Sequence, residues 1–120
     1  MSEIEEVLRA IKSALADGSR DVESGQRDAR WHRVSVVDRE SGRSFEVLFD
    51  GTSIRLGIDG GYETAYLDVE SEGVADILPE IVGIAGAYLA GAVVVRKVSR
   101  RRGAAEVSVI VDDVTHRFFR

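Results

Sequence analysis

Hydrophobic positions along the chain repeat with two different periods, which divide it into helices and strands. The longest apolar stretch, Ile81 to Val95, contains fifteen consecutive residues without a charge. Its first part has the spacing of a helix with a wide apolar face, because hydrophobic residues fall on two neighbouring stripes. Pro79 is typical of a first helical turn and Gly91 of a helix C-terminus. The pattern predicts a buried helix over residues 79–90, preceded by a looser turn from Val74.

This stretch is not predicted to cross a membrane. A transmembrane helix needs about 20 apolar residues. The apolar run here is shorter, contains Gly83, Gly86 and Gly91, and continues into three valines at 93–95. Glycines weaken a lone helix in lipid, and β-branched residues favour a strand. We therefore expect a soluble core helix that packs closely against a sheet and is followed by a strand.

A second helix is predicted at the N-terminus. Ser2 and Glu5 have the spacing of a capping box, and hydrophobic residues then recur at helical intervals up to Gly18. The next segment, Ser19–Arg30, contains a single large aliphatic residue, Val22. Because so little of it can be buried, this segment is interpreted as a solvated and mobile connection.

Strand patterns follow in quick succession. Alternating hydrophobic and polar residues predict four strands before the core helix, at Trp31–Asp38, Ser44–Phe49, Ser53–Ile58 and Tyr62–Val69. The Asp50-Gly51 and Asp59-Gly60-Gly61 sequences are predicted to be hairpin turns, since Asp-Gly supplies the positive φ that a tight turn needs. Three more extended segments are predicted after the helix, at Ala92–Ser99, Ala105–Asp112 and Val114–Phe119.

The element order predicts a single α+β domain over residues 1–120. It would consist of an antiparallel sheet of about six strands, an N-terminal helix and a buried second helix, in the order α-β-β-β-β-α-β-β. A chain of 120 residues buries about two-thirds of the surface that its unfolded form exposes, so it needs no metal or disulfide to fold. It contains no cysteine, and its first residues lack the basic-then-apolar order of a signal peptide. We therefore expect a cytoplasmic protein.

The charges are unevenly distributed. The formal net charge is −5, yet the segment Leu56–Val95 contains no Lys or Arg. It holds seven acidic residues: Asp59, Glu63, Asp68, Glu70, Glu72, Asp76 and Glu80. A surface of one sign steers an oppositely charged partner. We therefore expect a patch that binds a protein with a basic surface, made of Asp59, Glu63, Asp68, Glu70 and Glu72, with Trp31 as an aromatic anchor.

Five basic residues follow this acidic segment, between Arg96 and Arg102. Clustered cations favour nucleic acid through counterion release, but the cluster lacks stacking aromatic residues and the chain as a whole is acidic. The cluster is interpreted as a solvated hairpin tip, with contact to another protein as the alternative. No nucleic-acid binding is expected.

Candidate catalytic and metal-binding residues are few. His32 and His116 lie in strand patterns far apart in sequence, and neither has a neighbour at the spacing of a metal or catalytic motif. The Asp112-Asp113 pair is interpreted as a turn or strand end, because adjacent strand residues point to opposite faces. We therefore expect structural histidines, no bound metal or cofactor, and no enzymatic activity.

The order of elements and the acidity resemble the class I type III secretion chaperones and the YbjN-like peptide-binding chaperones, and are similar to several small bacterial toxin-immunity proteins. The resemblance covers most of the chain, although the usual final helix of the chaperones is missing and no functional positions carry over. It implies a non-enzymatic protein-binding module. An immunity protein that neutralises a cognate toxin is the first hypothesis, a secretion or peptide-binding chaperone the second, and a small-ligand-binding or catalytic domain using His32 or His116 the third. The sequence leaves open whether the chain forms a homodimer.

Overall fold

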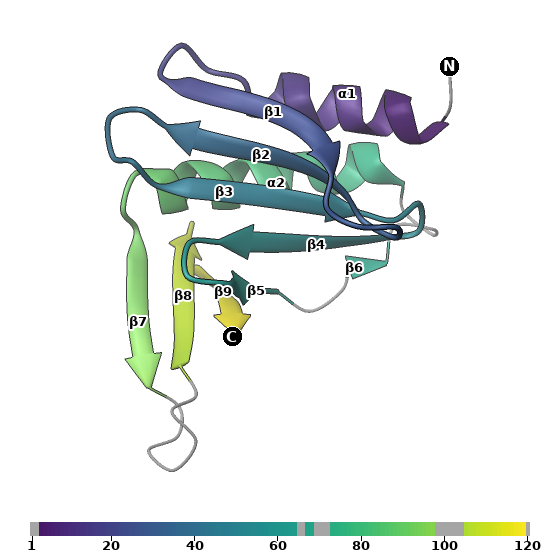
Figure 1. The fold of residues 1–120 in the computed structure, drawn as a ribbon. Coiled ribbons are helices and arrows are strands. Elements are labelled where there is room, and N and C mark those ends of the chain that lie inside the picture. The colour runs from purple at the N-terminus through teal and green to yellow at the C-terminus, as the bar shows by residue number, and fades with distance from the viewer. Residues whose placement is uncertain (1–2, 65–66, 69–72, 98–104, 120) are drawn as a thin grey trace.

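The computed structural model describes residues 3–64, 67–68, 73–97 and 105–119, and Figure 1 shows how their helices and strands are arranged. The helices are α1 (Glu3–Leu15) and α2 (Val74–Leu89). Six strands lie between them: β1 (Arg20–Gln26), β2 (His32–Asp38), β3 (Ser44–Phe49), β4 (Ser53–Ile58), β5 (Tyr62–Glu63) and β6 (Leu67–Asp68). Three follow α2: β7 (Val93–Lys97), β8 (Ala105–Val111) and β9 (Val114–Phe119). The predicted α+β class and the order helix, strands, helix, strands are confirmed, but the described residues form nine strands where about six are predicted.

The strands form one antiparallel sheet in the order β1-β2-β3-β4-β5-β9-β8-β7, with β6 pairing to β4. Consecutive strands β1 to β5 make a meander, and β7, β8 and β9 make a second one. Among the described residues the two meanders meet at one registered pair, Glu63 with Phe119. In Figure 1 the strands β7 and β8 run across the direction of β1–β4, so the sheet turns at this junction.

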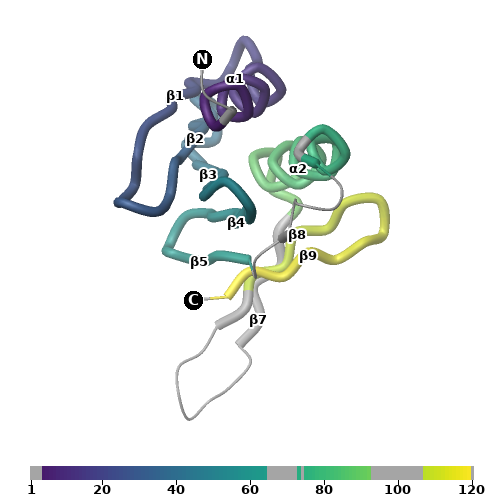
Figure 2. Tube along the Cα trace, turned by 90° about the vertical axis from the view of Figure 1, so that its right-hand side faces the viewer, coloured from purple at the N-terminus to yellow at the C-terminus, as the bar shows by residue number. Residues whose placement is uncertain are grey.

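Both helices lie on the same face of the sheet, as the end-on view in Figure 2 shows. That face carries the alternate, hydrophobic residues of the strands, and cross-strand partners such as Val34, Val47 and Leu56 fall in one row. They form a single core with both helices, which includes the fully buried residues Ile11, Leu15, Phe45, Ile54, Ile81 and Phe118. We call the opposite face of β1–β5, which carries no helix in the described part of the chain, the uncovered face.

Helix α2 begins earlier than the sequence pattern predicts. It starts at Val74, so the stretch before Pro79 is helical and not a looser turn. Proline inside a helix removes the hydrogen bond to the residue four positions earlier, here Ala75, but Ala75 is exposed and water can replace that bond. The predicted end is confirmed: Gly91 has φ 95°, its N–H donates to the carbonyl of Tyr88, and the N–H of Ala92 donates to that of Ala87. These two bonds form a Schellman motif.

The segment Ser19–Arg30 is not the solvated connection that its composition predicts. Its first part is the edge strand β1, which pairs with β2 along its whole length. An edge strand is held by backbone hydrogen bonds and needs few buried side chains, so only Val22 packs against the core. The true connection is short and runs from Arg27 to Arg30.

Two further predictions need adjustment. The single strand predicted at Tyr62–Val69 is two short strands, β5 and β6, which pair with different parts of β4. The N-terminal helix ends at Leu15, three residues before Gly18. The predicted cap residue Ser2 and the tip residues Arg100, Arg101 and Arg102 lie outside the described residues. In the part of the chain that the structure describes, neither helix is long and apolar enough to span a membrane.

Candidate functional site

The uncovered face carries a network of charged side chains that begins in the loop between β1 and β2. The Asp28 carboxylate accepts hydrogen bonds from the backbone N–H groups of Arg30 (2.8 Å) and Trp31 (2.9 Å). These backbone bonds lower the pKa of Asp28, and the bond from Trp31 has the larger effect. The loop is therefore closed by its own side chain, as in an Asx turn, and brings Arg27 and Arg30 to fixed positions.

Arg30 links this loop to the turn between β3 and β4. Its guanidinium lies 4.8 Å from the centre of the Trp31 ring, and its Nε donates to Oδ2 of Asp50 at 3.0 Å. Oδ1 of Asp50 accepts from the N–H groups of Thr52 (3.0 Å) and Ser53 (2.7 Å). Burial raises the pKa of Asp50, but these bonds outweigh burial and the net pKa is lowered. The Asp50-Gly51 turn is confirmed, and its carboxylate also holds Arg30.

Arg27 reaches across the sheet to Glu63 on β5. Its guanidinium donates to Oε1 of Glu63 at 2.6 Å, while Arg55 donates to Oε2 at 3.2 Å. The hydrogen bond to Glu63 is the main reason that the pKa of Arg27 is raised. The sequence assigns Glu63 to the acidic patch. In the structure its carboxylate is held between Arg27 and Arg55, two cations that lie outside the acidic segment Leu56–Val95.

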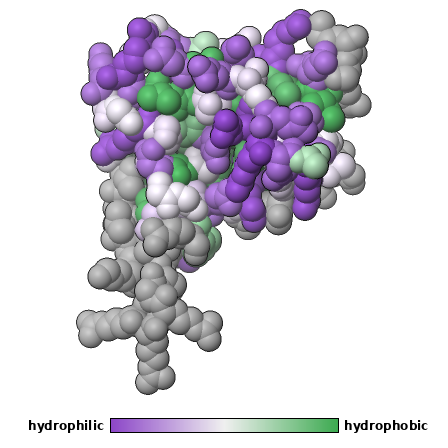
Figure 3. All heavy atoms as spheres, in the orientation of Figure 1, coloured by the Kyte–Doolittle hydropathy of each residue, from purple (hydrophilic) through white to green (hydrophobic). Residues whose placement is uncertain are grey.

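Carboxylates lie in one row across the uncovered face. The register aligns Glu23, Ser35, Glu46, Gly57 and Glu63 on successive strands from β1 to β5. Gly57 has no side chain, so that of Glu46 lies over it: a Cβ at position 57 would come within 2.8 Å of the Glu46 carboxylate. We call Glu23, Glu46 and Glu63 the glutamate row. Figure 3 shows that this side of the molecule is mainly hydrophilic, with small separate hydrophobic areas.

Asp59 has a structural role at the far end of β4. Its carboxylate accepts hydrogen bonds from the N–H of Ser44 (2.9 Å), the hydroxyl of Ser44 and the hydroxyl of Tyr88 on α2 (2.6 Å). Burial raises its pKa, but these bonds and the nearby Arg43 outweigh burial, so the net pKa is lowered. Asp59 belongs to the predicted turn and ties the sheet to α2.

The predicted acidic patch is not assembled as one rim. Asp59 lies at one end of β4, whereas the backbone of Asp68 pairs with Ser53 at the other end. At a rise of about 3.3 Å per residue these ends are roughly 20 Å apart. Glu63 lies between them on the uncovered face, and Glu70 and Glu72 lie outside the described residues. Residues that are close in sequence are separated because the chain reverses direction around β4.

Trp31 does not offer the exposed ring that an anchor for a partner needs. Only 5% of it is accessible, and Arg30 lies over its ring. Trp31 and Leu48 are both buried but lie outside the main core cluster. The register places Leu48 between Arg33 and Arg55 on the uncovered face. Trp31 therefore stabilises the loop between β1 and β2.

The two histidines lie on the helix-covered face of the sheet. His32 is half-buried in the row of Phe49 and Ile54. His116 is the partner of Val109, and its Nδ1 lies 3.9 Å from Oε1 of Glu80 on α2. His116 and Glu80 line a cavity of about 320 Å³ between α2, β4 and β9, together with Leu56, Thr64, Ile84, Thr115 and Arg117. Sequence reasoning missed this pairing because 36 residues separate the two.

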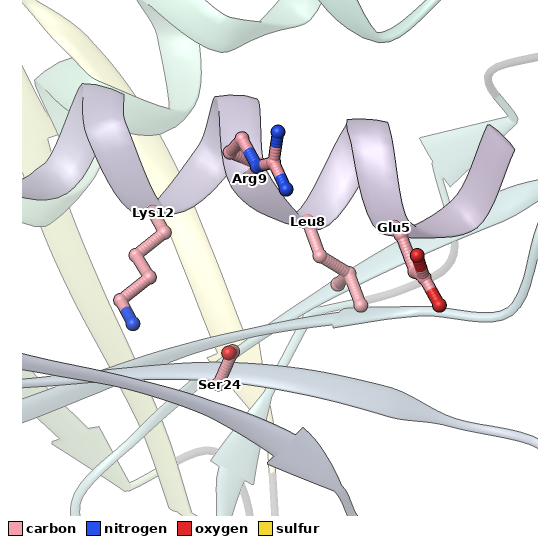
Figure 4. Close-up of a pocket in the computed structure, with 5 residues that line it drawn as sticks. All are labelled: Glu5, Leu8, Arg9, Lys12 and Ser24. Atoms are coloured by element: carbon pink, nitrogen blue, oxygen red, sulfur yellow. The ribbon is translucent and has the colours of Figure 1, made fainter. Parts of the chain in front are cut away.

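A second cavity, of about 390 Å³, lies between α1 and the edge strand β1 (Figure 4). The side chains of Glu5, Leu8 and Lys12 extend from the helix toward the strand that carries Ser24, and Arg9 completes the lining. Its charges are mixed, so it has no clear preference for a ligand of one sign. Among the described residues no group of three or more His, Asp or Glu side chains has the arrangement of a metal site.

Asp112-Asp113 is a turn, as predicted. The two residues have φ 48° and 67° and join β8 to β9 next to the pair Val111 and Val114. Positive φ at both central positions is the conformation of a type I′ hairpin turn. The basic cluster is described only at Arg96 and Lys97, whose backbone is part of β7. Comparisons with protein-family models, with curated proteins and with solved structures find no match to this chain.

Proposed function

We propose that the chain is a non-enzymatic protein-binding module, and that its first role is that of an immunity protein that neutralises a cognate bacterial toxin by binding it. One observation carries the proposal: the glutamate row lies across the five strands β1–β5, on a face that no helix of the described chain covers. Neighbouring strands are about 4.8 Å apart, so Glu23 and Glu46 are roughly 10 Å apart. A row of this length matches a protein surface better than a small molecule.

The network around the row supports binding without rearrangement. Asp28 and Asp50 hold the loop that carries Arg27 and Arg30, and Arg27 and Arg55 hold Glu63. A surface whose side chains are already ordered loses less conformational entropy when a partner binds. Glu23 and Glu46 extend the acidic character toward β1, where a basic partner would dock. The acidic site is thus proposed around β1–β3 and no longer around residues 59–72.

The test uses the protein encoded next to this chain in its genome as the partner. The double variant Glu23→Lys/Glu46→Lys should slow association at least about tenfold at low salt, and the difference should shrink as salt rises. The matched control, Glu6→Lys/Glu40→Lys, has the same net charge but changes exposed residues outside the row. Stopped-flow measurement gives the association rate constant of each variant with the partner. Equal slowing by the control would contradict the proposed site.

A chaperone role predicts a different partner state. An immunity protein binds its toxin folded, whereas a secretion or peptide-binding chaperone binds an extended segment of its cargo. Titrating the folded partner and its isolated segments against the chain separates these two roles. Binding of a segment as tight as that of the whole partner would favour the chaperone.

The cavity that contains His116 and Glu80 supports a second candidate, a small-ligand site. Buried Leu56 and Ile84 give it an apolar floor, and Thr64, His116 and Glu80 give it polar walls. This is the composition of a binding pocket for small molecules. Native mass spectrometry of freshly purified protein tests it: a metabolite retained by the wild type and lost by His116→Ala would support the candidate.

A further inference from the structure

The sheet ends in two edge strands, β1 and β7, and they differ in how each is protected. β1 runs beside α1, and its sequence carries Asp21 and Glu23. β7 has the sequence VVVRK, pairs only with β8 in the described part of the chain, and reaches beyond the body of the molecule in Figure 1. An apolar edge strand with open backbone groups readily pairs with another strand.

Exposed hydrophobic side chains gather in the same half of the sheet. Among the described residues four large hydrophobic side chains are exposed, and three of them, Ile110, Val114 and Phe119, lie on β8 and β9. Ile110 lies on β8, the strand next to the edge strand β7, whereas Val114 and Phe119 lie one strand further in, on β9. Exposed apolar groups near an open edge are features of an association surface. The fourth, Val37, lies on β2 in the other meander.

The register identifies which backbone groups of β7 face outward. The N–H of Ile110 donates to the carbonyl of Ala92 at 3.3 Å, so the backbone of Ala92 faces β8. In an antiparallel ladder the direction of these groups alternates along the strand. Val94 and Arg96 therefore also bond to β8, whereas the N–H and C=O groups of Val93, Val95 and Lys97 face the open edge.

We propose that two copies of this chain associate by antiparallel pairing of their β7 strands, with the two-fold axis at Val95. Val95 then pairs with Val95 of the second copy, and Val93 pairs with its Lys97. Each of these pairs joins outward-facing residues, which exchange both of their backbone hydrogen bonds. The two sheets become one continuous sheet through a symmetric interface.

The charges on β7 favour this register and this partner. With the axis at Val95, Arg96 lies opposite Val94 of the second copy, so no cation faces a cation. A shift that places the axis at Arg96 would oppose two arginines, which is unfavourable. The other edge is less suited to self-pairing, because an axis at the centre of β1 would oppose Glu23 with its own copy.

Proline substitution distinguishes the outward-facing edge from the rest of the strand. Val95→Pro removes one outward N–H and leaves the β7–β8 hydrogen bonds in place. The matched control is Ser24→Pro on β1. Backbone bonds join Ser19 to Arg39 and Arg27 to Trp31 just beyond the two ends of the β1–β2 pairing, so by alternation the backbone groups of Ser24 face outward. Sedimentation equilibrium over a range of concentrations should show a dimer for the wild type and for Ser24→Pro. Val95→Pro should have a dissociation constant at least about tenfold higher.

Circular dichroism first establishes that both variants are folded. If Val95→Pro does not fold, hydrogen exchange of the wild type takes the place of the variant experiment. The amides of Val93, Val95 and Lys97 should exchange faster when the protein is diluted, whereas the exchange rates of Val22 and Ser24 should not change. A wild type that stays monomeric at every concentration would overturn the proposal. So would a dimer that Val95→Pro leaves intact.

Discussion

The hydroxyl of Tyr88 on α2 donates a 2.6 Å hydrogen bond to the carboxylate of Asp59, which also accepts two hydrogen bonds from Ser44 at the start of β3. A helix and two strands are thus joined at one acidic side chain. Arg43 lies beside them, 6.0 Å from the centre of the Tyr88 ring, in space that Gly91 leaves open. This contact couples the packing of α2 to the ionisation of Asp59.

Removing the hydroxyl should destabilise the fold in a pH-dependent way. Tyr88→Phe should lower the free energy of unfolding by about 1–2 kcal/mol at neutral pH, since a hydrogen bond to a charged group is lost. The pKa of Asp59 is lower in the folded state, so its contribution is present above the ordinary carboxyl pKa and is lost as the pH falls through the folded value. Urea denaturation at pH 7 and pH 3 should show the loss shrinking in acid. An equal loss at both pH values, or strict additivity with Asp59→Asn, would contradict this coupling.

The same contact should be visible in alkaline titration. Burial, followed by the hydrogen bond and charge of Asp59, raises the pKa of Tyr88 from 10.0 to about 12. Because the folded pKa is raised, the contribution of neutral Tyr88 to stability is present below pH 10 and is lost as the pH rises toward about 12. Ultraviolet titration should show a late component from Tyr88. The late component should be absent from Tyr88→Phe.

The ion pair between Arg27 and Glu63 should contribute modestly to stability. Both side chains are partly exposed, at 40% and 22%, so water and salt screen the pair. A double-mutant cycle with Arg27→Ala and Glu63→Ala should give a coupling of about 0.5–1 kcal/mol that decreases with added salt. Arg33→Ala with Glu63→Ala provides a comparison pair. Equal coupling in both cycles would show that the contact between Arg27 and Glu63 is not specific.

Truncation of buried side chains on the second helix should lower the free energy of unfolding much more. Ile84 and Leu89 are 2% and 1% exposed, so replacing either with Ala should lower the free energy of unfolding by about 2–5 kcal/mol. The control Ile110→Ala changes a residue that is 44% exposed and should alter stability by less than about 0.5 kcal/mol. Chemical denaturation measures all three, and a near-wild-type midpoint for Ile84→Ala would be incompatible with the core described above.

Sequence patterns predicted the elements that bury side chains and missed those held by other means. Alternation at Phe45, Val47 and Phe49 identified β3, because one face of that strand enters the core. β1 was missed because it is joined mainly through its backbone and buries little, and the start of α2 was misplaced because Pro79 normally marks a first turn.

The candidate site was less predictable than the fold. The acidic segment lacks basic residues in its sequence, but the fold places basic side chains beside it. The sheet brings Arg27 and Arg55 to Glu63, and the packing of α2 brings Tyr88 to Asp59. Such contacts depend on strand register, which one sequence does not specify at the level of single side chains. For the same reason the alignment of Glu23 with Glu46 could not be foreseen.

In the described part of the chain one registered pair, Glu63 with Phe119, joins the two meanders, and this has a consequence for how the molecule opens. Within each meander, neighbouring hairpins join residues that are close in sequence, so they can form and break locally. The junction and α2 join the two meanders through residues that are far apart in sequence. Cooperative opening units in proteins commonly coincide with such motifs. The amides of β8 and β9 should therefore exchange together, with a free energy of opening below that of β2 and β3. The molecule would then have a stable half and a more labile half, with α2 as the element common to both.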